Sequence, residues 1–176
     1  MSPTGLKWVG VAPHSVVEPP RLFVQLLDNK YQTPMTSNVL IRMRVFDEIG
    51  AFEESFRGMY EDQAFFMKLC LREKVYVSDA RWAKYRQHAD SHCARVEKGR
   101  AAESLRRPLL DWIARYVREQ GIAEPAALIA LERALYPYQR PRRYRAERFV
   151  RRCVSSTKTR LSVWKRNAAA VRQERR

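Results

Sequence analysis

An acidic pair, Glu61-Asp62, is the feature of this sequence best suited to chemistry. The run that follows it, AFFMKLCLR, has apolar residues at helical spacing, so the pair is predicted in the first turn of a helix. The free amides and dipole of that turn favour a charged carboxylate, which suits a general base or an ion ligand. The alternative is that the pair only caps the helix, because acidic residues are common at helix starts.

A second candidate is His88, which lies in the run YRQHADSH with His92 four residues later. Imidazole at such a position can bind a divalent metal. Spacing alone favours a structural histidine, and a zinc finger would need a C-x-x-C pair that is absent. The sequence also has no glycine-rich phosphate loop, no H-E-x-x-H and no G-x-S-x-G.

The elements that would position these residues can be read from apolar spacing and from Gly and Pro. Residues 1–20 are predicted to be irregular. Expected helices are Arg21 to Asp28, Met43 to Ile49 ending at Gly50, Tyr60 to Arg72, a long one from Arg100 to Gly121, and one from Pro125 to Leu135. Expected strands are Val39 to Ile41, which would be buried, and Val75 to Ser78. Pro137 and Pro141 are expected to break the chain before a basic tail.

Charge is distributed unevenly along the 176 residues, whose formal net charge is +15. Residues 1–80 carry 9 basic and 10 acidic residues, whereas residues 140–176 carry 14 basic and two acidic ones. Such a tail attracts polyanions, so docking on anionic membrane or on nucleic acid is one hypothesis. In the nucleic-acid version Tyr144, Phe149 and Trp164 would stack on bases. A solvated basic segment is the favoured alternative to nucleic-acid binding.

The cysteines and the hydropathy indicate the compartment. Cys70, Cys93 and Cys153 are widely spaced and odd in number, which is typical of free thiols in a reducing environment. The first residues lack the apolar core of a secretory signal, and no run is long enough to span a membrane. We therefore expect a cytoplasmic protein whose membrane contact would be peripheral, at the inner face.

The succession TSNVLIRMRVFDEIGAFEESFRGMYEDQAFFMKLCL, followed by VYVSDARWAKYRQHADS, resembles the C-terminal half of family-2 bacterial glycosyltransferases of the GT-A fold. The resemblance spans roughly residues 20–140 and is most specific from Phe46 to Ser91. It implies an α/β fold, in which residues 21–99 form a partial GT-A (Rossmann-like) domain that corresponds to its C-terminal half. A mainly helical extension at 100–139 and the basic tail at 140–176 would follow.

The resemblance also implies roles for individual residues. Asp62 matches the general base that deprotonates the acceptor hydroxyl in an inverting transfer, and Glu61 is its preceding partner. Gly50 and the loop Ala51 to Gly58 match the family's glycine-containing segment beside the donor and acceptor, although Ala51 stands where a second glycine is frequent. His88 matches a ligand of the divalent metal, Mg²⁺ or Mn²⁺, that neutralises the nucleotide diphosphate. Arg86 is a candidate for binding phosphate charge.

One departure from the family affects the expected activity. The D-x-D motif that supplies the main metal carboxylate is absent from this chain, so we expect a truncated or split enzyme. Alone it should be nearly inactive, and an N-terminal polypeptide that binds the nucleotide would complete it. The expected partners are a nucleotide-sugar donor and a saccharide, lipid-linked or protein acceptor. Nucleic acid is not expected as a partner of the enzyme, and the second hypothesis is a non-catalytic basic scaffold.

Overall fold

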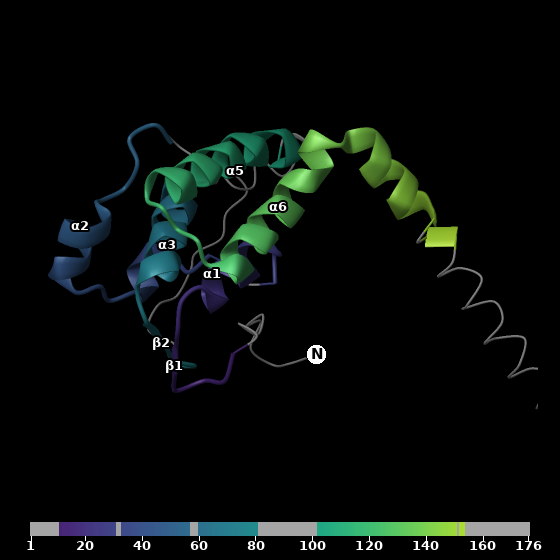
Figure 1. Ribbon diagram of the computed structural model, residues 1–176. Helices are drawn as coiled ribbons and strands as arrows, with labels where there is room; N and C mark the ends of the chain where they lie inside the picture. Colours follow the sequence, from purple (N-terminus) through teal and green to yellow (C-terminus); the bar gives the residue numbers. More distant parts are fainter. Residues whose placement is uncertain (1–10, 31–32, 57–59, 81–101, 151, 154–176) are drawn as a thin grey trace, which may run out of the picture. The chain divides into compact units, whose positions relative to one another are not determined.

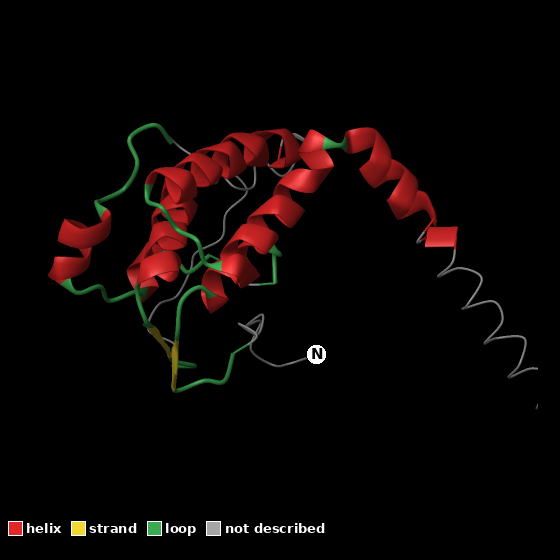
Figure 2. Ribbon diagram, viewed as in Figure 1, coloured by secondary structure: helices red, strands yellow, loops and turns green. Residues whose placement is uncertain are grey.

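The computed structural model describes residues 11–30, 33–56, 60–80, 102–150 and 152–153, with the backbone alone at 102–105 (Figure 1). The chain divides into two compact units, residues 1–135 and residues 136–176. In the described part of the first unit, helices dominate and one two-stranded sheet is present (Figure 2).

Helix α3 (Glu61–Arg72) forms the centre of the first unit. Its residues are buried without interruption from Ala64 to Leu71. Helices α1 (Arg21–Leu27), α2 (Met43–Ile49) and α5 (Ala102–Glu119) all contact it. A helix that is buried on every side must be covered by other elements, and these three helices contribute to covering α3. Its position is therefore fixed from several directions, and so is the carboxylate pair at its start.

Polar contacts join the C-terminal end of α1 to the later helices of this unit. Nη2 of Arg106, in α5, donates to the carbonyl oxygen of Leu27 at 2.7 Å. Nη2 of Arg133, in α6 (Pro125–Gln139), lies 2.8 Å from Oδ1 of Asp28. The carbonyls at a helix end have no partner within the helix, so these arginines bind a site that needs donors and positive charge.

Strands β1 (Ser15–Val17) and β2 (Val75–Val77) pair antiparallel, with Val16 opposite Tyr76. His14 joins the two segments just before β1 begins. Its Nε2 lies 2.9 Å from Oδ1 of Asp79, and its Nδ1 lies 3.1 Å from the hydroxyl oxygen of Tyr76. The ladder brings the segment before α1 against the segment after α3.

Most of the predicted elements are confirmed. Helices α1, α2, α3 and α5 lie where the apolar spacing placed them, and Gly50 ends α2 with φ 77°. Strand β2 lies within the predicted Val75 to Ser78. No helix in the described parts of the chain has both the length and the apolar character that crossing a membrane demands.

The predicted buried strand from Val39 to Ile41 is wrong. The backbone is extended at Val39, which follows the 3₁₀ helix η1 (Thr36–Asn38), with φ −132° and ψ 137°. No strand in the described residues pairs with it, and Leu40 is fully exposed. Extended backbone becomes a strand only when a partner accepts its ladder of hydrogen bonds, and aliphatic residues alone do not supply one.

Two further predictions need correction. Residues 1–20 were expected to be irregular, yet they contain β1, whose partner lies about sixty residues away in sequence. Pro137 was expected to end the helix that begins at Pro125, yet it lies inside α6. The backbone N–H of Arg140 still donates to the carbonyl of Tyr136 at 3.0 Å, so helical bonding continues past the proline.

Candidate functional site

The acidic pair lies at the start of α3, as the sequence predicted. Tyr60 precedes the helix in a left-handed conformation, with φ 70° and ψ 2°, and its carbonyl accepts the backbone N–H of Ala64 at 2.8 Å. Positive φ is uncommon for a residue with a bulky side chain and costs of order 1–3 kcal/mol. The chain therefore turns sharply before Glu61 and Asp62, which occupy the first helical turn.

Asp62 is half-buried, and its surroundings make it a stronger base than a free aspartate. Burial raises the pKa of its carboxyl group, and the charge of Glu61 raises it further. The backbone N–H of Gln63 donates to Oδ1 at 2.7 Å and lowers the pKa, but burial has the larger effect. A carboxylate with a raised pKa accepts a proton more readily near neutral pH.

A pocket of about 520 Å³ lies against the first turn of α3. Its walls come from η1, from the loop after α2 and from the start of α3 itself. The lining residues are Thr36, Phe52, Glu53, Glu54, Phe56, Glu61 and Asp62. Four carboxyl groups and two phenyl rings line it, and no lining residue is basic. Such a lining accepts hydrogen bonds, offers an apolar surface and disfavours an anion.

The two phenylalanines of the pocket are held by aromatic contacts behind them. Phe52 stacks on Phe65 of α3, with ring centroids 4.6 Å apart. Phe56 meets Trp112 of α5 edge to face, with centroids 5.7 Å apart. Aromatic pairs at these separations contribute about 0.5–1.5 kcal/mol beyond the area that they bury. The loop after α2 is thereby fastened to both α3 and α5.

Lys68 is a further residue of this site, and the sequence alone assigned it no role. Its side chain is 2% exposed, and its Nζ donates to the carbonyl of Ala51 at 2.7 Å and to Oε1 of Glu53 at 2.6 Å. A buried lysine normally requires such partners. The available signal was a lysine inside the apolar run FFMKLCL, on a helix that proved to be enclosed on all sides. Lys68 orients Glu53, one wall of the pocket.

Gly50 lies next to this lysine and does not line the pocket. Its backbone N–H donates to the carbonyl of Phe46 at 3.0 Å, and its φ of 77° with ψ of 172° turns the chain from α2 into the loop. A Cβ at this position would come within 3.6 Å of Nζ of Lys68. The glycine therefore acts on the pocket through the loop that begins there, and its predicted contact with substrate stays a prediction.

The other two predicted site residues, Arg86 and His88, lie outside the described residues, so their roles also stay predictions. Among the residues whose structure is described, no three His, Cys, Asp or Glu side chains are grouped closely enough to hold a metal ion. The carboxylates of the pocket thus do not by themselves form a metal centre, and one of them, Glu53, already pairs with Lys68.

Comparison with known proteins gives no match: no protein-family model, no curated protein and no solved structure. What this chain does must therefore be argued from its own residues. The strongest of these observations is the half-buried Asp62 at the edge of a pocket that is rich in carboxylates and aromatic rings.

Proposed function

We propose that this chain carries the acceptor side of an inverting, nucleotide-sugar-dependent glycosyltransferase of the family-2, GT-A type, with Asp62 as general base. Two things support the proposal. The first is the sequence resemblance from Phe46 to Ser91. The second, which carries most weight, is that Asp62 combines a raised pKa with a place in the pocket lining. A carboxylate that merely capped the helix would need neither property.

In the proposed reaction the acceptor hydroxyl lies within hydrogen-bond distance of Asp62. Its oxygen attacks the anomeric carbon of the donor sugar from the face opposite the leaving group. The new C–O bond forms as the bond from that carbon to the nucleoside diphosphate breaks, and the diphosphate leaves with the electron pair. The acceptor proton passes to Asp62. Oδ1 also accepts the N–H of Gln63, which orients the carboxylate for this transfer.

The lining of the pocket suggests a saccharide as acceptor. Glu54 and Glu61 can accept hydrogen bonds from sugar hydroxyls, whereas Phe52 and Phe56 can contact the C–H face of the ring. A phosphate group in the same place would face several carboxylates and no lining cation, which is unfavourable. We therefore expect a neutral sugar to bind better than its phosphate ester.

The divalent metal remains part of the proposal through His88, and no step above is assigned to it. When bound, such an ion would stabilise charge on the leaving diphosphate. The donor site and the main metal carboxylate, from the D-x-D motif, belong to the nucleotide-binding half that the resemblance implies. Transfer would take place in the cytoplasm, the compartment that the free cysteines and the hydropathy predict.

Binding of saccharides to the chain tests the proposed pocket directly. Saturation-transfer NMR with a panel of neutral hexoses and disaccharides, and with their phosphate esters, should detect selective binding of a neutral sugar. Phe52→Ala should abolish that signal. Asp111→Asn, a change on an exposed part of α5, is the matched control and should leave it intact. If no saccharide in the panel binds, the acceptor pocket is misassigned.

The role of Asp62 needs a turnover assay, with the chain supplemented by a nucleotide-binding half and with Mg²⁺ or Mn²⁺ present. Asp62→Asn keeps the shape of the side chain and an acceptor for Gln63, but it cannot take a proton. It should lower kcat by about 10²–10⁴-fold while KM for the acceptor changes little. A variant that keeps full transfer activity would exclude Asp62 as the base, even if sugar still binds.

A further inference from the structure

The second unit contains a helix whose surface the proposed reaction does not use. Residues 141–150, with 152 and 153, are helical and are called here the basic helix. The side chains at 141–150 are exposed except that of Tyr144, which is partly buried. Two of the exposed ones are large and apolar: Phe149 is 69% exposed and Val150 is 58% exposed. Exposed apolar groups next to each other on a charged helix call for a functional explanation.

These apolar residues share one face of the basic helix. At 3.6 residues per turn Ala146, Phe149, Val150 and Cys153 form a strip along one side. Arginines border the strip on both sides, Arg145 and Arg152 along one edge and Arg143 along the other. Arg142 stands at its N-terminal end. The result is an amphipathic helix with its apolar strip exposed and framed by cations.

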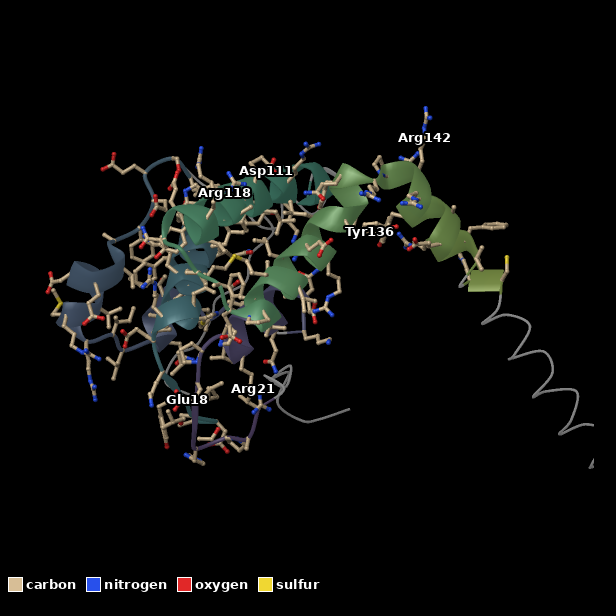
Figure 3. The ribbon with its side chains drawn as sticks, in the orientation of Figure 1. Glu18, Arg21, Asp111, Arg118, Tyr136 and Arg142 are labelled. Carbon is tan, nitrogen blue, oxygen red and sulfur yellow. The ribbon has the colours of Figure 1, made fainter. Side chains whose placement is uncertain are left out.

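The opposite face is occupied by contacts with the end of α6. The ring of Tyr144 meets that of Tyr136 edge to face, with centroids 6.2 Å apart. The hydroxyl of Tyr136 donates to Oε1 of Glu147 at 2.6 Å, and this hydrogen bond raises the pKa of Tyr136. Figure 3 shows Arg142 extending from the side away from Tyr136. Glu147 is the only acidic residue from 140 to 173, and its hydrogen bond directs its carboxylate toward Tyr136.

This arrangement fits a phospholipid surface better than a nucleic acid. Nucleic acid is bound through its phosphates and through stacking on aromatic rings, and aliphatic side chains such as those of Val150 and Ala146 contribute to neither. A membrane interface uses both parts of the pattern. Apolar side chains enter the acyl region, while arginines at the edges reach the anionic head groups through their long stems. Each basic residue near such a surface adds to the attraction.

We propose that the basic helix binds in the plane of an anionic phospholipid membrane, with Phe149 and Val150 inserted and the bordering arginines on the head groups. The full-length chain should co-sediment with phosphatidylcholine vesicles that contain about 30% phosphatidylglycerol, because this content gives the vesicles a substantial negative surface potential. It should bind pure phosphatidylcholine vesicles weakly. Binding to the anionic vesicles should fall as salt rises from low to high concentration.

Matched variants separate the two contributions. Phe149→Ser/Val150→Ser should weaken binding to the anionic vesicles by at least about tenfold. Leu128→Ser/Ile129→Ser removes another exposed apolar pair, from α6, where Leu128 is 42% and Ile129 60% exposed, and should have no effect. Arg143→Gln/Arg145→Gln should also weaken binding, whereas Arg115→Gln/Arg118→Gln on α5 should not. Circular dichroism establishes that each variant keeps its helices.

A spin label reports insertion independently of affinity. A nitroxide on Cys153, in a Cys93→Ser background, should gain accessibility to oxygen when anionic vesicles are added, because Cys153 lies on the strip. A nitroxide on Tyr144→Cys, in a background that also carries Cys153→Ser, should not gain accessibility to oxygen. Any of three results would overturn the proposal. They are binding to pure phosphatidylcholine vesicles as strong as to the anionic ones, undiminished vesicle binding by the Phe149/Val150 variant, and binding of single-stranded RNA without binding of vesicles. None of these results depends on sugar transfer.

Discussion

Lys68 and Glu53 form an asymmetric ion pair at the base of the pocket. Their charged groups are 2.6 Å apart, but the lysine side chain is 2% exposed whereas that of Glu53 is 30% exposed. The ammonium therefore depends on the protein for all its partners, and the carboxylate still reaches water. Each partner should thus respond differently when the other is removed.

Removing the carboxylate should destabilise the protein more than removing the lysine. Glu53→Gln leaves a buried ammonium without a counter-charge, and we expect a loss near the lower end of about 3–5 kcal/mol, because the amide oxygen still accepts a hydrogen bond. Lys68→Met lets Glu53 turn to solvent and should cost about 1–3 kcal/mol. Urea unfolding followed by circular dichroism measures both losses.

The double variant tests whether the two residues act as a pair. Combining the two changes should cost clearly less than the sum of the single losses, because the double variant leaves no buried charge without a partner. Arg107→Gln/Asp111→Asn is the control cycle, since that pair is exposed on both sides and should show little coupling. Additive losses at Lys68 and Glu53 would contradict the proposed positioning of the pocket wall.

Asp62→Asn should make the protein more stable at neutral pH. Because the pKa of Asp62 is raised in the fold, its contribution to stability is complete below the ordinary value of 3.8 and is lost as pH rises through the folded value. Asparagine resembles the protonated acid at every pH. Its melting temperature should therefore exceed that of the native protein at pH 7, and the difference should vanish below about pH 4.

The control for this prediction is Glu61→Gln, which removes the neighbouring exposed charge. This change should remove only part of the upward pKa shift of Asp62, because burial raises that pKa more than Glu61 does. A melting temperature of Asp62→Asn that falls below the native one at pH 7 would mean that the favourable interaction with the helix dipole outweighs burial. Asp62 would then be a cap rather than a strained functional group.

The sequence was sufficient for features that depend on local pattern. The spacing of apolar residues located α3. Because the acidic pair directly precedes those residues, Asp62 was predicted in the first turn. Gly50 ended α2 because few other residues adopt its backbone angles. The pairing of Val16 with Tyr76 could not be foreseen, since nothing local to either strand specifies a partner so distant in sequence. Lys68 was missed for the same reason, because its partners lie in another segment.

Gly50→Ala should destabilise the first unit through its backbone. A φ of 77° with ψ of 172° is a region that residues with a Cβ rarely occupy, and we expect a cost of about 1–3 kcal/mol. Space is not the cause, because the nearest atom to an added Cβ would be 3.6 Å away. Gly121→Ala is the control: its φ is 61° and no atom lies within 4 Å of an added Cβ.

The two glycine variants should differ in their effect on the pocket. Gly50→Ala should also weaken the saccharide signal, because the loop that carries Phe52 and Glu53 begins there. Gly121→Ala should lower the melting temperature and leave that signal unchanged. If both variants lose stability equally and both bind sugar normally, the turn at Gly50 does not position the loop.

The reactivity of Cys70 tests the enclosure of α3, on which the placement of Asp62 depends. Burial raises the pKa of this thiol from 9.0 to about 12, so its thiolate should be roughly a thousandfold scarcer than that of a free cysteine at pH 8. A variant with Cys70 alone should react with a disulfide reagent only as fast as the fold opens. A variant with Cys153 alone, which is exposed, should react at once. In increasing urea, labelling of Cys70 should follow the loss of helical signal. Rapid labelling in the absence of urea would mean that α1 and α5 do not enclose α3, and the rigid support of the carboxylate pair would be lost with it.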